Sequence, residues 1–435
     1  MSRLAILGGD PVRTRLFPAY QTMGAEEMAA VRRVMESGNL SQYLGAWHED
    51  FMGGPEVRRL EETWAAHFGV PHALAVNSAT SGLFAAVGAC GAGPGDEVIV
   101  SPYTMSASAI AAAVYGAVPV FADIDPESFC LSAATIAPKL TPRTKAIIVV
   151  HIFGGPADMD AILALARPRG IKVIEDCAQA PGALYRGRPV GGLGDLGVFS
   201  LNYHKHIHTG EGGVVTTRDP ELAERVSLIR NHGEVVVGPK GREDLAGLVG
   251  YNYRLTELQA AIAVEQLGKL PGLVEERIRN VEFLAARLAG LPGLRPVVPG
   301  GPDRHVFYLH PVHYDSAALG VARNVFVDAL KRELPSARLR ETTPLIGAGY
   351  VKPLYLQPFY QKRLHPCVFN CPRYAGRVDY SLGSCPVVER MHFEELVTHE
   401  FMRPGMTADD LNEVVAAFEK VVAGANELHA TSTLR

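Results

Sequence analysis

The chain has 435 residues, of which 47% are hydrophobic and 20% charged, a composition typical of globular proteins and unlike that of disordered or fibrous chains. Its formal net charge is -4 and it has no long run of Lys and Arg, which gives no electrostatic basis for binding nucleic acid or an anionic membrane. A chain of this length predicts two domains, one of them large.

The N-terminal sequence MSRLAILGGDP has only a short apolar run and lacks the pattern of a secretory signal peptide. The uncharged segment 102–122 has the length of a membrane span, but Gly116 and Pro119 interrupt it, so we predict a buried helix followed by a strand. Six cysteines are too few for a disulfide framework in so long a chain. We expect a cytoplasmic protein with reduced thiols and no membrane segment.

Short β-branched runs alternate with helical stretches over the first half of the chain. This alternation predicts an α/β fold with a mostly parallel central sheet of about seven strands flanked by helices. The runs predicted to be strands are 72–76, 96–100, 118–124, 145–153, 171–176, 197–202 and 212–217.

A helical pattern that begins at Thr256 continues past Pro271 and predicts a long helix joining two domains. We therefore divide the chain into an N-terminal arm, a large α/β domain and a smaller C-terminal α+β domain. Their predicted bounds are 1–24, 25–270 and 271–435.

The second half is harder to interpret. Residues 305–315 alternate as a strand does, 342–372 look irregular, and a final helix follows Met406, where Thr407 and Asp410 resemble a capping box. We expect the histidines of the predicted strand to lie scattered on the surface, and the segment HPCVFNC matches no zinc-ligand spacing, so no metal is expected. The residues concerned are His305, His310, His313, His365, Cys367 and Cys371.

Lys205 lies in the segment FSLNYHKHIHTGEGG, between a Phe-Ser pair and a glycine-rich turn. Lysine is rarely buried without a partner, and a desolvated lysine amine is a nucleophile suited to forming a Schiff base with an aldehyde. His204, His206 and His208 share this segment, so a solvated lysine on a polar loop is the alternative. The segment alone leaves both interpretations open.

Asp176 ends a predicted parallel strand, at the sheet edge where open α/β folds bind ligands. A cofactor that joins an aldehyde to a pyridine ring needs an anion beside the ring nitrogen, because only the protonated ring withdraws electrons strongly. Asp176 can supply that anion, and Gln179 could donate a hydrogen bond to the ring hydroxyl. The alternative is that Asp176 only caps the following turn.

Residues 77–81, NSATS, join a predicted strand to a helix, so their amides and hydroxyls stand at a helix N-terminus and suit a phosphate. An ordinary Ser/Thr helix cap explains the same residues. Ser200, five residues before Lys205, could add a hydroxyl to the same phosphate, or it is simply a strand residue.

The order of strand, phosphate cradle, carboxylate and lysine is that of fold type I pyridoxal phosphate enzymes, and the chain resembles the DegT/StrS-type sugar aminotransferases. The resemblance extends over nearly the whole sequence. The segments that carry it include GAGPGDEVIV, EDCAQAPGA, FSLNYHKHIHTGEGG, RNHG and GYNYRLTELQAAIAVEQL.

The resemblance implies that Lys205 is the catalytic Schiff-base lysine, that Asp176 pairs with the pyridinium and that Gln179 contacts the ring hydroxyl. Where the family has an aromatic residue stacked on the cofactor ring, this chain has Met105, and Tyr103 is the alternative. A methionine thioether can pack on an aromatic ring.

The resemblance also assigns Ala79, Thr80 and Ser200 to the phosphate site. Asn252 matches an asparagine that in this family reaches the phosphate of the neighbouring subunit's cofactor. A homodimer with shared active sites is therefore implied.

The implied activity is that of a pyridoxal 5'-phosphate-dependent aminotransferase. It would move an amino group from glutamate or glutamine to a keto sugar, for which a nucleotide-linked form is expected, or to a cyclitol, through a Lys205 Schiff base and pyridoxamine phosphate. A pyridoxamine-dependent sugar dehydratase of the same fold is the first alternative, disfavoured because such relatives have histidine in place of the lysine. A non-catalytic cofactor-binding regulator is the second.

Overall fold

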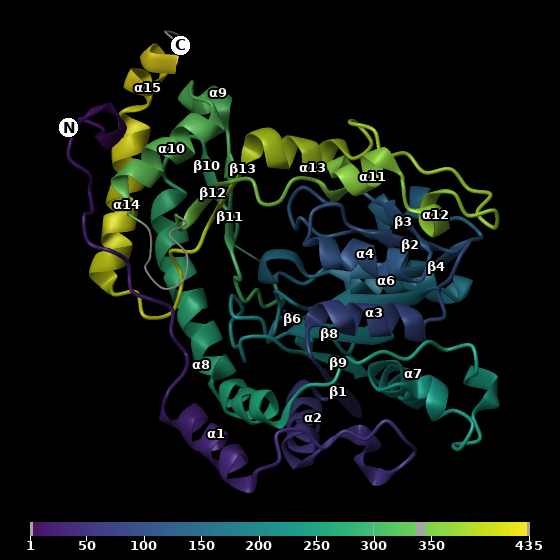
Figure 1. Ribbon diagram of the computed structural model, residues 1–435. Helices are drawn as coiled ribbons and strands as arrows, with labels where there is room; N and C mark the ends of the chain where they lie inside the picture. The colour runs from purple at the N-terminus through teal and green to yellow at the C-terminus, as the bar shows by residue number, and fades with distance from the viewer. Residues whose placement is uncertain (1–2, 299, 336–343, 433–435) are drawn as a thin grey trace.

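The computed structural model describes residues 3–298, 300–335 and 344–432. Seven strands form its central sheet: β1 (His72–Val76), β2 (Glu97–Val100), β3 (Val118–Phe121), β4 (Thr144–Val150), β5 (Lys172–Asp176), β8 (Leu196–Ser200) and β9 (Gly213–Thr217). Their order across the sheet is β1-β9-β8-β5-β4-β2-β3, and only β9 runs antiparallel to its neighbours (Figure 1). The predicted α/β fold with a mostly parallel seven-stranded sheet is confirmed.

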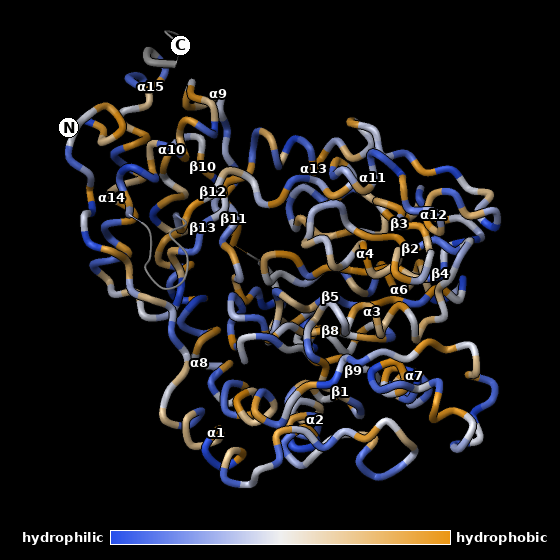
Figure 2. Tube along the Cα trace, viewed as in Figure 1, coloured by the Kyte–Doolittle hydropathy of each residue, from blue (hydrophilic) through white to orange (hydrophobic). Residues whose placement is uncertain are grey.

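Helices cover this sheet, which is why β2, β8 and β9 consist of buried residues throughout. The segments around α3, α4 and α6 are accordingly mostly hydrophobic in Figure 2. The helices of the first part are α1 (Ala25–Ser37), α2 (Pro55–Phe68), α3 (Ala79–Ala89), α4 (Ser106–Val114), α5 (Ala133–Ile136), α6 (Met159–Ala166) and α7 (Pro220–Arg230).

The long helix predicted from Thr256 is α8 (Glu257–Leu288), which contains Pro271. Its first half packs on α1 and α2, and its second half packs on α14 (Ala408–Ala423). The helix runs without a break through the predicted division at residue 270, and that division stays a prediction. Within the described residues, no helix is both long enough and apolar enough to cross a membrane.

A second, antiparallel sheet has the order β10-β11-β13-β12. It packs with α10 and α14 around a separate core that includes Val312, Phe326, Val397 and Phe418. The capping box predicted before the final helix is present at the start of α14. The bounds are β10 (Leu294–Pro296), β11 (His310–Tyr314), β12 (Ile346–Ala348), β13 (Leu396–His399), α9 (Ser316–Leu319), α10 (Arg323–Glu333) and α15 (Ala425–Ser432).

Part of the C-terminal half packs against the large sheet. This part carries α11 (Pro358–Lys362), α12 (Pro366–Phe369) and α13 (Pro386–Arg390), which lie beside β3 in Figure 1. Phe121 at the end of β3 packs against Tyr355, Tyr360 and Tyr380, with ring centroids 5.0 to 5.9 Å apart. The segment predicted as irregular, 342–372, therefore contains short helices and β12, while its first two residues lie outside the described ranges.

The histidines predicted to be scattered on the surface are mostly buried, so that prediction was wrong. The strand begins only at His310, because Phe307 has the left-handed φ of 49° and breaks the extended run. His305 is buried before the strand, and the buried His310 forms a 2.9 Å hydrogen bond with His399. Pairing with another polar group is what allows such side chains to leave water.

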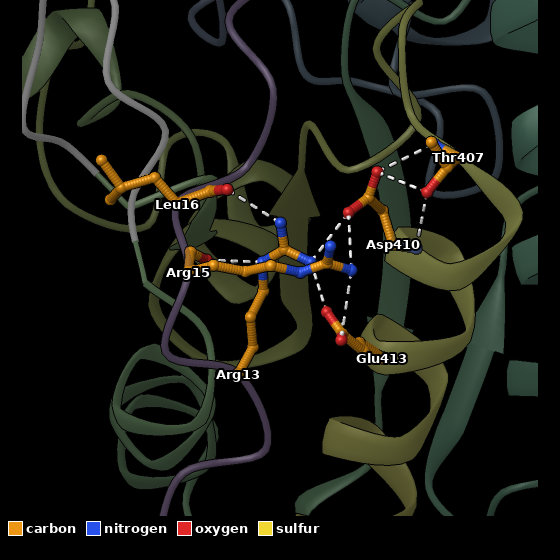
Figure 3. Close-up of polar contacts among 6 residues, drawn as sticks. All are labelled: Arg13, Arg15, Leu16, Thr407, Asp410 and Glu413. Atoms are coloured by element: carbon orange, nitrogen blue, oxygen red, sulfur yellow. Dashed lines mark hydrogen bonds and ion pairs between the residues drawn. The ribbon is translucent and has the colours of Figure 1, made fainter.

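The N-terminal arm is fixed to α14 by a buried ion pair, shown in Figure 3. Arg13 donates to Asp410 over 2.8 Å and also to Glu413, and a third hydrogen bond of 2.8 Å reaches the carbonyl of Leu16. The other oxygen of Asp410 accepts hydrogen bonds from Thr407. The pair thus joins the first residues of the chain to the cap of one of its last helices.

We expect Arg13→Met to lower the free energy of unfolding by about 3 kcal/mol, because two carboxylates lose a buried counter-charge. The matched control is Arg15→Met, which removes a 60% exposed guanidinium that contacts the same carboxylates at 3.5 and 3.3 Å. That change should cost less than about 1 kcal/mol, since water screens exposed pairs. Urea denaturation of the full-length protein measures both, and equal losses would contradict the argument.

Candidate functional site

A cavity of about 640 Å³ lies where the carboxyl ends of β5 and β8 and the N-terminus of α3 face β12 and β13 of the second sheet. Six of the eight predicted site residues line it, whereas Gln179 and Asn252 do not. The six are Ala79, Thr80, Met105, Asp176, Ser200 and Lys205.

Lys205 lies in a loop of residues 201–212, called the lysine loop below, which connects β8 to β9. Backbone hydrogen bonds of 2.9 Å cross the base of this loop, from Leu201 to Gly212 and from Tyr203 to Gly210. Gly213, the first residue of β9, approaches the N-terminus of α3 so closely that a Cβ there would stand 2.7 Å from the amide nitrogen of Ala79. This contact places the lysine loop beside the predicted phosphate cradle.

The histidines of the lysine loop do not form a polar surface. His206 and His208 are buried, and only His204 is exposed, on the cavity wall. The Nε2 of His206 donates to the carbonyl of Val306 over 2.8 Å. Burial, with the nearby Arg277 cation, keeps the pKa of His206 well below its usual value, so the ring is neutral and anchors the loop.

The N-terminal arm and α8 support the lysine loop from behind. The hydroxyl of Tyr20 donates to the carbonyl of His206. Gln266 of α8 accepts hydrogen bonds from Thr22 over 2.7 Å and from the backbone of His208 over 3.3 Å. The position of the loop therefore depends on segments far from it in sequence.

Lys205 is half-buried as a residue, and its Nζ lies 4.4 Å from the ring centroid of Tyr308. Burial lowers the pKa of Lys205 to about 8, although Asp176 and Glu400 both favour the charged form. A minority of the amine, far larger than in a solvated lysine, is consequently neutral near physiological pH. A neutral lysine amine is a nucleophile and a proton acceptor, which a solvated surface lysine is not.

Asp176 is buried at the end of β5 with its carboxylate held in place. Ser108 of α4 donates to one oxygen over 2.7 Å, and the backbone of Ala178 donates to the other over 3.1 Å. The second bond is the turn cap that the sequence offered as an alternative. Because the same carboxylate also lines the cavity, the cap and a ligand-binding role are compatible.

The amide of Gln179 is occupied within the protein. Its oxygen accepts from the backbone of Phe153 over 2.8 Å, and its nitrogen donates to the hydroxyl of Tyr350 over 2.9 Å. Tyr350, not Gln179, is part of the cavity wall. Of the two candidates for ring stacking, Met105 is 62% exposed and lines the cavity, whereas Tyr103 is fully buried outside it.

The first turn of α3 lines the cavity. Ser78 caps the helix by accepting the amide of Ser81 over 3.1 Å, as the simpler interpretation predicted. Ala79 and Thr80, which follow the cap, and Ser200 at the end of β8 all line the cavity. Unpaired amides and the helix dipole at such a terminus favour an anion.

Asn252 is exposed and lies outside the cavity of its own chain. Its side-chain oxygen accepts from Arg254 over 2.8 Å, and its backbone carbonyl accepts from the side chain of Asn77 over 3.4 Å. The residue therefore stands next to the segment that leads into α3, with its side chain at the molecular surface.

The groups that line the cavity fit pyridoxal phosphate. An amine with a lowered pKa, a fixed carboxylate and a helix N-terminus converge on one cavity, and they match the aldehyde, the ring nitrogen and the phosphate of that molecule. A mostly parallel sheet with this set at its carboxyl edge defines the class of fold type I enzymes.

The chain belongs to the DegT/DnrJ/EryC1/StrS aminotransferase family, whose model matches residues 21–419. It is 36% identical to L-glutamine:2-deoxy-scyllo-inosose aminotransferase of Streptomyces paromomycinus, over 96% of this chain and 97% of that protein. It is also 36% identical to GDP-perosamine synthase of Caulobacter vibrioides, over 85% and 91% of the two chains. This protein is therefore an aminotransferase, from a family that in general depends on pyridoxal phosphate.

Solved structures agree with this assignment. The structure of S. venezuelae DesV in complex with a ketimine intermediate superimposes with a TM-score of 0.75 at 31% identity. The match covers 92% of this chain and 94% of that one.

Sequence reasoning missed the residues that close the cavity from the second sheet. Glu400 follows β13, Tyr308 lies in an irregular segment before β11, and Tyr350 lies in one after β12. None belongs to a motif of fixed spacing near Lys205. Only the packing of the two sheets brings these side chains to the lysine.

The amine of Lys205 should react with formaldehyde under reducing conditions with a midpoint at about pH 8 in full-length protein freed of cofactor. Glu400→Gln should move this midpoint to lower pH, because a carboxylate stabilises the cation and its removal makes the proton easier to lose. Peptide mass spectrometry across a pH series measures the extent of modification at this residue.

The matched control is Glu211→Gln, which changes another carboxylate on the cavity wall that pairs with Asn202 and does not affect the pKa of Lys205. Its midpoint should equal that of the unmodified protein. A midpoint above pH 10 in the unmodified protein would show a solvated lysine and contradict the argument.

Proposed function

We propose that this protein uses pyridoxal 5'-phosphate to transfer an amino group from glutamine or glutamate to a keto sugar or a cyclitol ketone. The observation that carries the proposal is the lysine amine of lowered pKa beside a fixed carboxylate, in a cavity that a helix N-terminus also lines. The names of the two relatives support the donor and the acceptor class, since one names L-glutamine with an inosose and the other a GDP-linked amino sugar.

Each residue has a separate task in this proposal. The Nζ of Lys205 would bind the aldehyde of the cofactor, and Asp176 would hold a proton on the ring nitrogen. The amides of Ala79 and Thr80, with the hydroxyl of Ser200, would hold the phosphate. When bound, pyridoxal phosphate would supply an aldehyde carbon that can carry the amino group and a ring that withdraws electrons from it.

Lys205 is also suited to proton transfer once its amine is released. A pKa of about 8 lets the Nζ both accept and return a proton near neutral pH, because the charged and neutral forms are then close in free energy. Ser108 prevents the carboxylate of Asp176 from turning away, so the anion keeps its place throughout.

The walls of the cavity suit a polyhydroxylated acceptor. Glu211, Glu400 and Tyr350 contribute oxygen atoms from three separate segments, and oxygens of this kind accept hydrogen bonds from sugar or cyclitol hydroxyls. A cavity of about 640 Å³ is within the range of small-molecule sites.

We expect Lys205→Ala to reduce amino transfer at least about 1000-fold, because the protein loses its nucleophile and its proton carrier together. The assay incubates the cofactor-loaded protein with glutamine or glutamate and a panel of keto sugars and inososes, and detects amino products by mass spectrometry. Lys145→Ala, which removes an exposed lysine at the start of β4, is the matched control and should keep full activity.

Undiminished transfer by Lys205→Ala would disprove the mechanism. A deoxy product without net amino transfer would instead support the dehydratase. Bound cofactor without turnover on any acceptor of the panel would support a regulatory protein.

We also propose a homodimer in which Asn252 serves the cofactor site of the other subunit. Its exposed position outside its own cavity supports this arrangement, as does the family resemblance. A side chain that served its own site would be expected on the wall of that cavity.

Mixing inactive Lys205→Ala subunits with Asn252→Ala subunits should restore activity if sites are shared. In a mixed dimer, one site combines an intact lysine from one chain with an intact asparagine from the other, so such a dimer should have about half the wild-type rate. Subunits are exchanged by co-expression with two affinity tags, and mixed dimers are purified on both. Activity no higher than that of the separate variants would contradict the shared site.

A further inference from the structure

We propose that Tyr308 is a positioning residue for Lys205, whose amine it receives on the face of its ring. This inference rests on the proposed function, in which Lys205 is the reacting amine. It adds a side chain that holds the amine of Lys205 after the lysine has left the cofactor and before it transfers a proton.

The contact has the geometry of a cation–π interaction. The Nζ of Lys205 lies 4.4 Å from the ring centroid of Tyr308, within the distance at which a ring face attracts an ammonium group. Burial raises the pKa of the Tyr308 phenol, so the ring is neutral and acts through its face rather than through a phenolate charge. Both residues line the same cavity.

The charged groups around Lys205 attract its amine, but they do not define its position as the ring of Tyr308 does. Asp176 at the end of β5 and Glu400 after β13 attract the ammonium from two other elements, and the neighbouring His206 is neutral. Asp176 is fixed by its own partners and is needed for the cofactor. The ring of Tyr308 is the broad surface against which the lysine side chain rests.

Two unusual backbone conformations place this ring. Phe307, directly before Tyr308, has a φ of 49°, and Phe153 has a φ of 58°. Residues other than glycine seldom adopt such angles, which persist only where the surrounding structure determines them. The amide of Tyr308 donates to the carbonyl of Phe153 over 2.7 Å, so the residue after Phe307 is bound directly to Phe153.

The surroundings that maintain this strain include the lysine loop itself. His206 donates to the carbonyl of Val306 over 2.8 Å, and Arg277 of α8 donates to the carbonyl of Phe307 over 3.1 Å. Because His206 directly follows Lys205, the same hydrogen bond fixes the loop that carries the amine relative to the segment that carries the ring. The lysine and the ring are thus positioned as one unit.

The contact with Tyr308 matters most when the amine of Lys205 is released from the cofactor. A lysine with four rotatable bonds loses its position when it is no longer bound to the cofactor, unless a contact retains it. The ring face favours the charged form and offsets part of the burial that lowers the pKa of Lys205. Tyr308 therefore keeps the amine in place and in a protonation state suited to returning a proton.

The test compares Tyr308→Leu with Tyr308→Phe in full-length protein freed of cofactor. Formaldehyde modification of Lys205 is followed across a pH series by peptide mass spectrometry. In the leucine variant, which still excludes water but has no ring, the midpoint should fall by about 0.5 to 1 pH unit below that of the unmodified protein. In the phenylalanine variant the midpoint should stay within about 0.2 unit, since the ring face remains.

An unchanged midpoint in Tyr308→Leu would overturn the proposal, as would an equal fall in both variants, which would assign the effect to the hydroxyl. If the leucine variant does not fold, Tyr308→Met supplies a second side chain without a ring, and the same outcomes apply. With cofactor and substrates restored, the turnover number of the ring-free variant should fall about tenfold at little change in KM for the amino donor.

The midpoint is measured without cofactor or substrate, so it does not depend on the reaction. Failure of the proposed function would appear as retained transfer by Lys205→Ala. Failure of the present inference would appear as an unchanged midpoint, and the two results are separate.

Discussion

The site depends on removing one lysine amine from water while keeping carboxylates near it. Burial lowers the pKa of Lys205 to about 8, while the carboxylates of Asp176 and Glu400 keep the charged form accessible. A fully solvated lysine would stay protonated. A lysine buried without nearby carboxylates would stay neutral and would have no proton to return. The surrounding structure holds the amine between these limits.

This constraint explains why distant segments meet around the lysine loop. The loop is anchored by His206 to the carbonyl of Val306, by Tyr20 of the N-terminal arm and by Gln266 of α8. The arm is in turn fixed to α14 by the buried ion pair of Arg13. The large sheet supplies the carboxylate and the helix N-terminus, and the second sheet supplies the opposite wall.

Much of the fold followed from local patterns. The first five strands of the central sheet, β1 to β5, alternate with helices. Their β-branched runs are typical of a sheet that is covered on both faces. The long helix α8 was predicted by its capping residues and its apolar period. The strand expected at 305–315 was shortened because Phe307 takes a left-handed conformation that only its tertiary contacts maintain. Its histidines were misjudged for the same reason, since burial depends on partners such as His399.

The sequence by itself determined which chemical groups stand at the carboxyl edge of the sheet, because strand ends and a helix start have fixed places in an α/β fold. Lys205, Asp176 and the first turn of α3 follow from that rule. Tertiary structure alone decided how these groups behave. Desolvation, the ring of Tyr308 and the charge of Glu400 act through space across two sheets, and sequence separation carries no information about such distances.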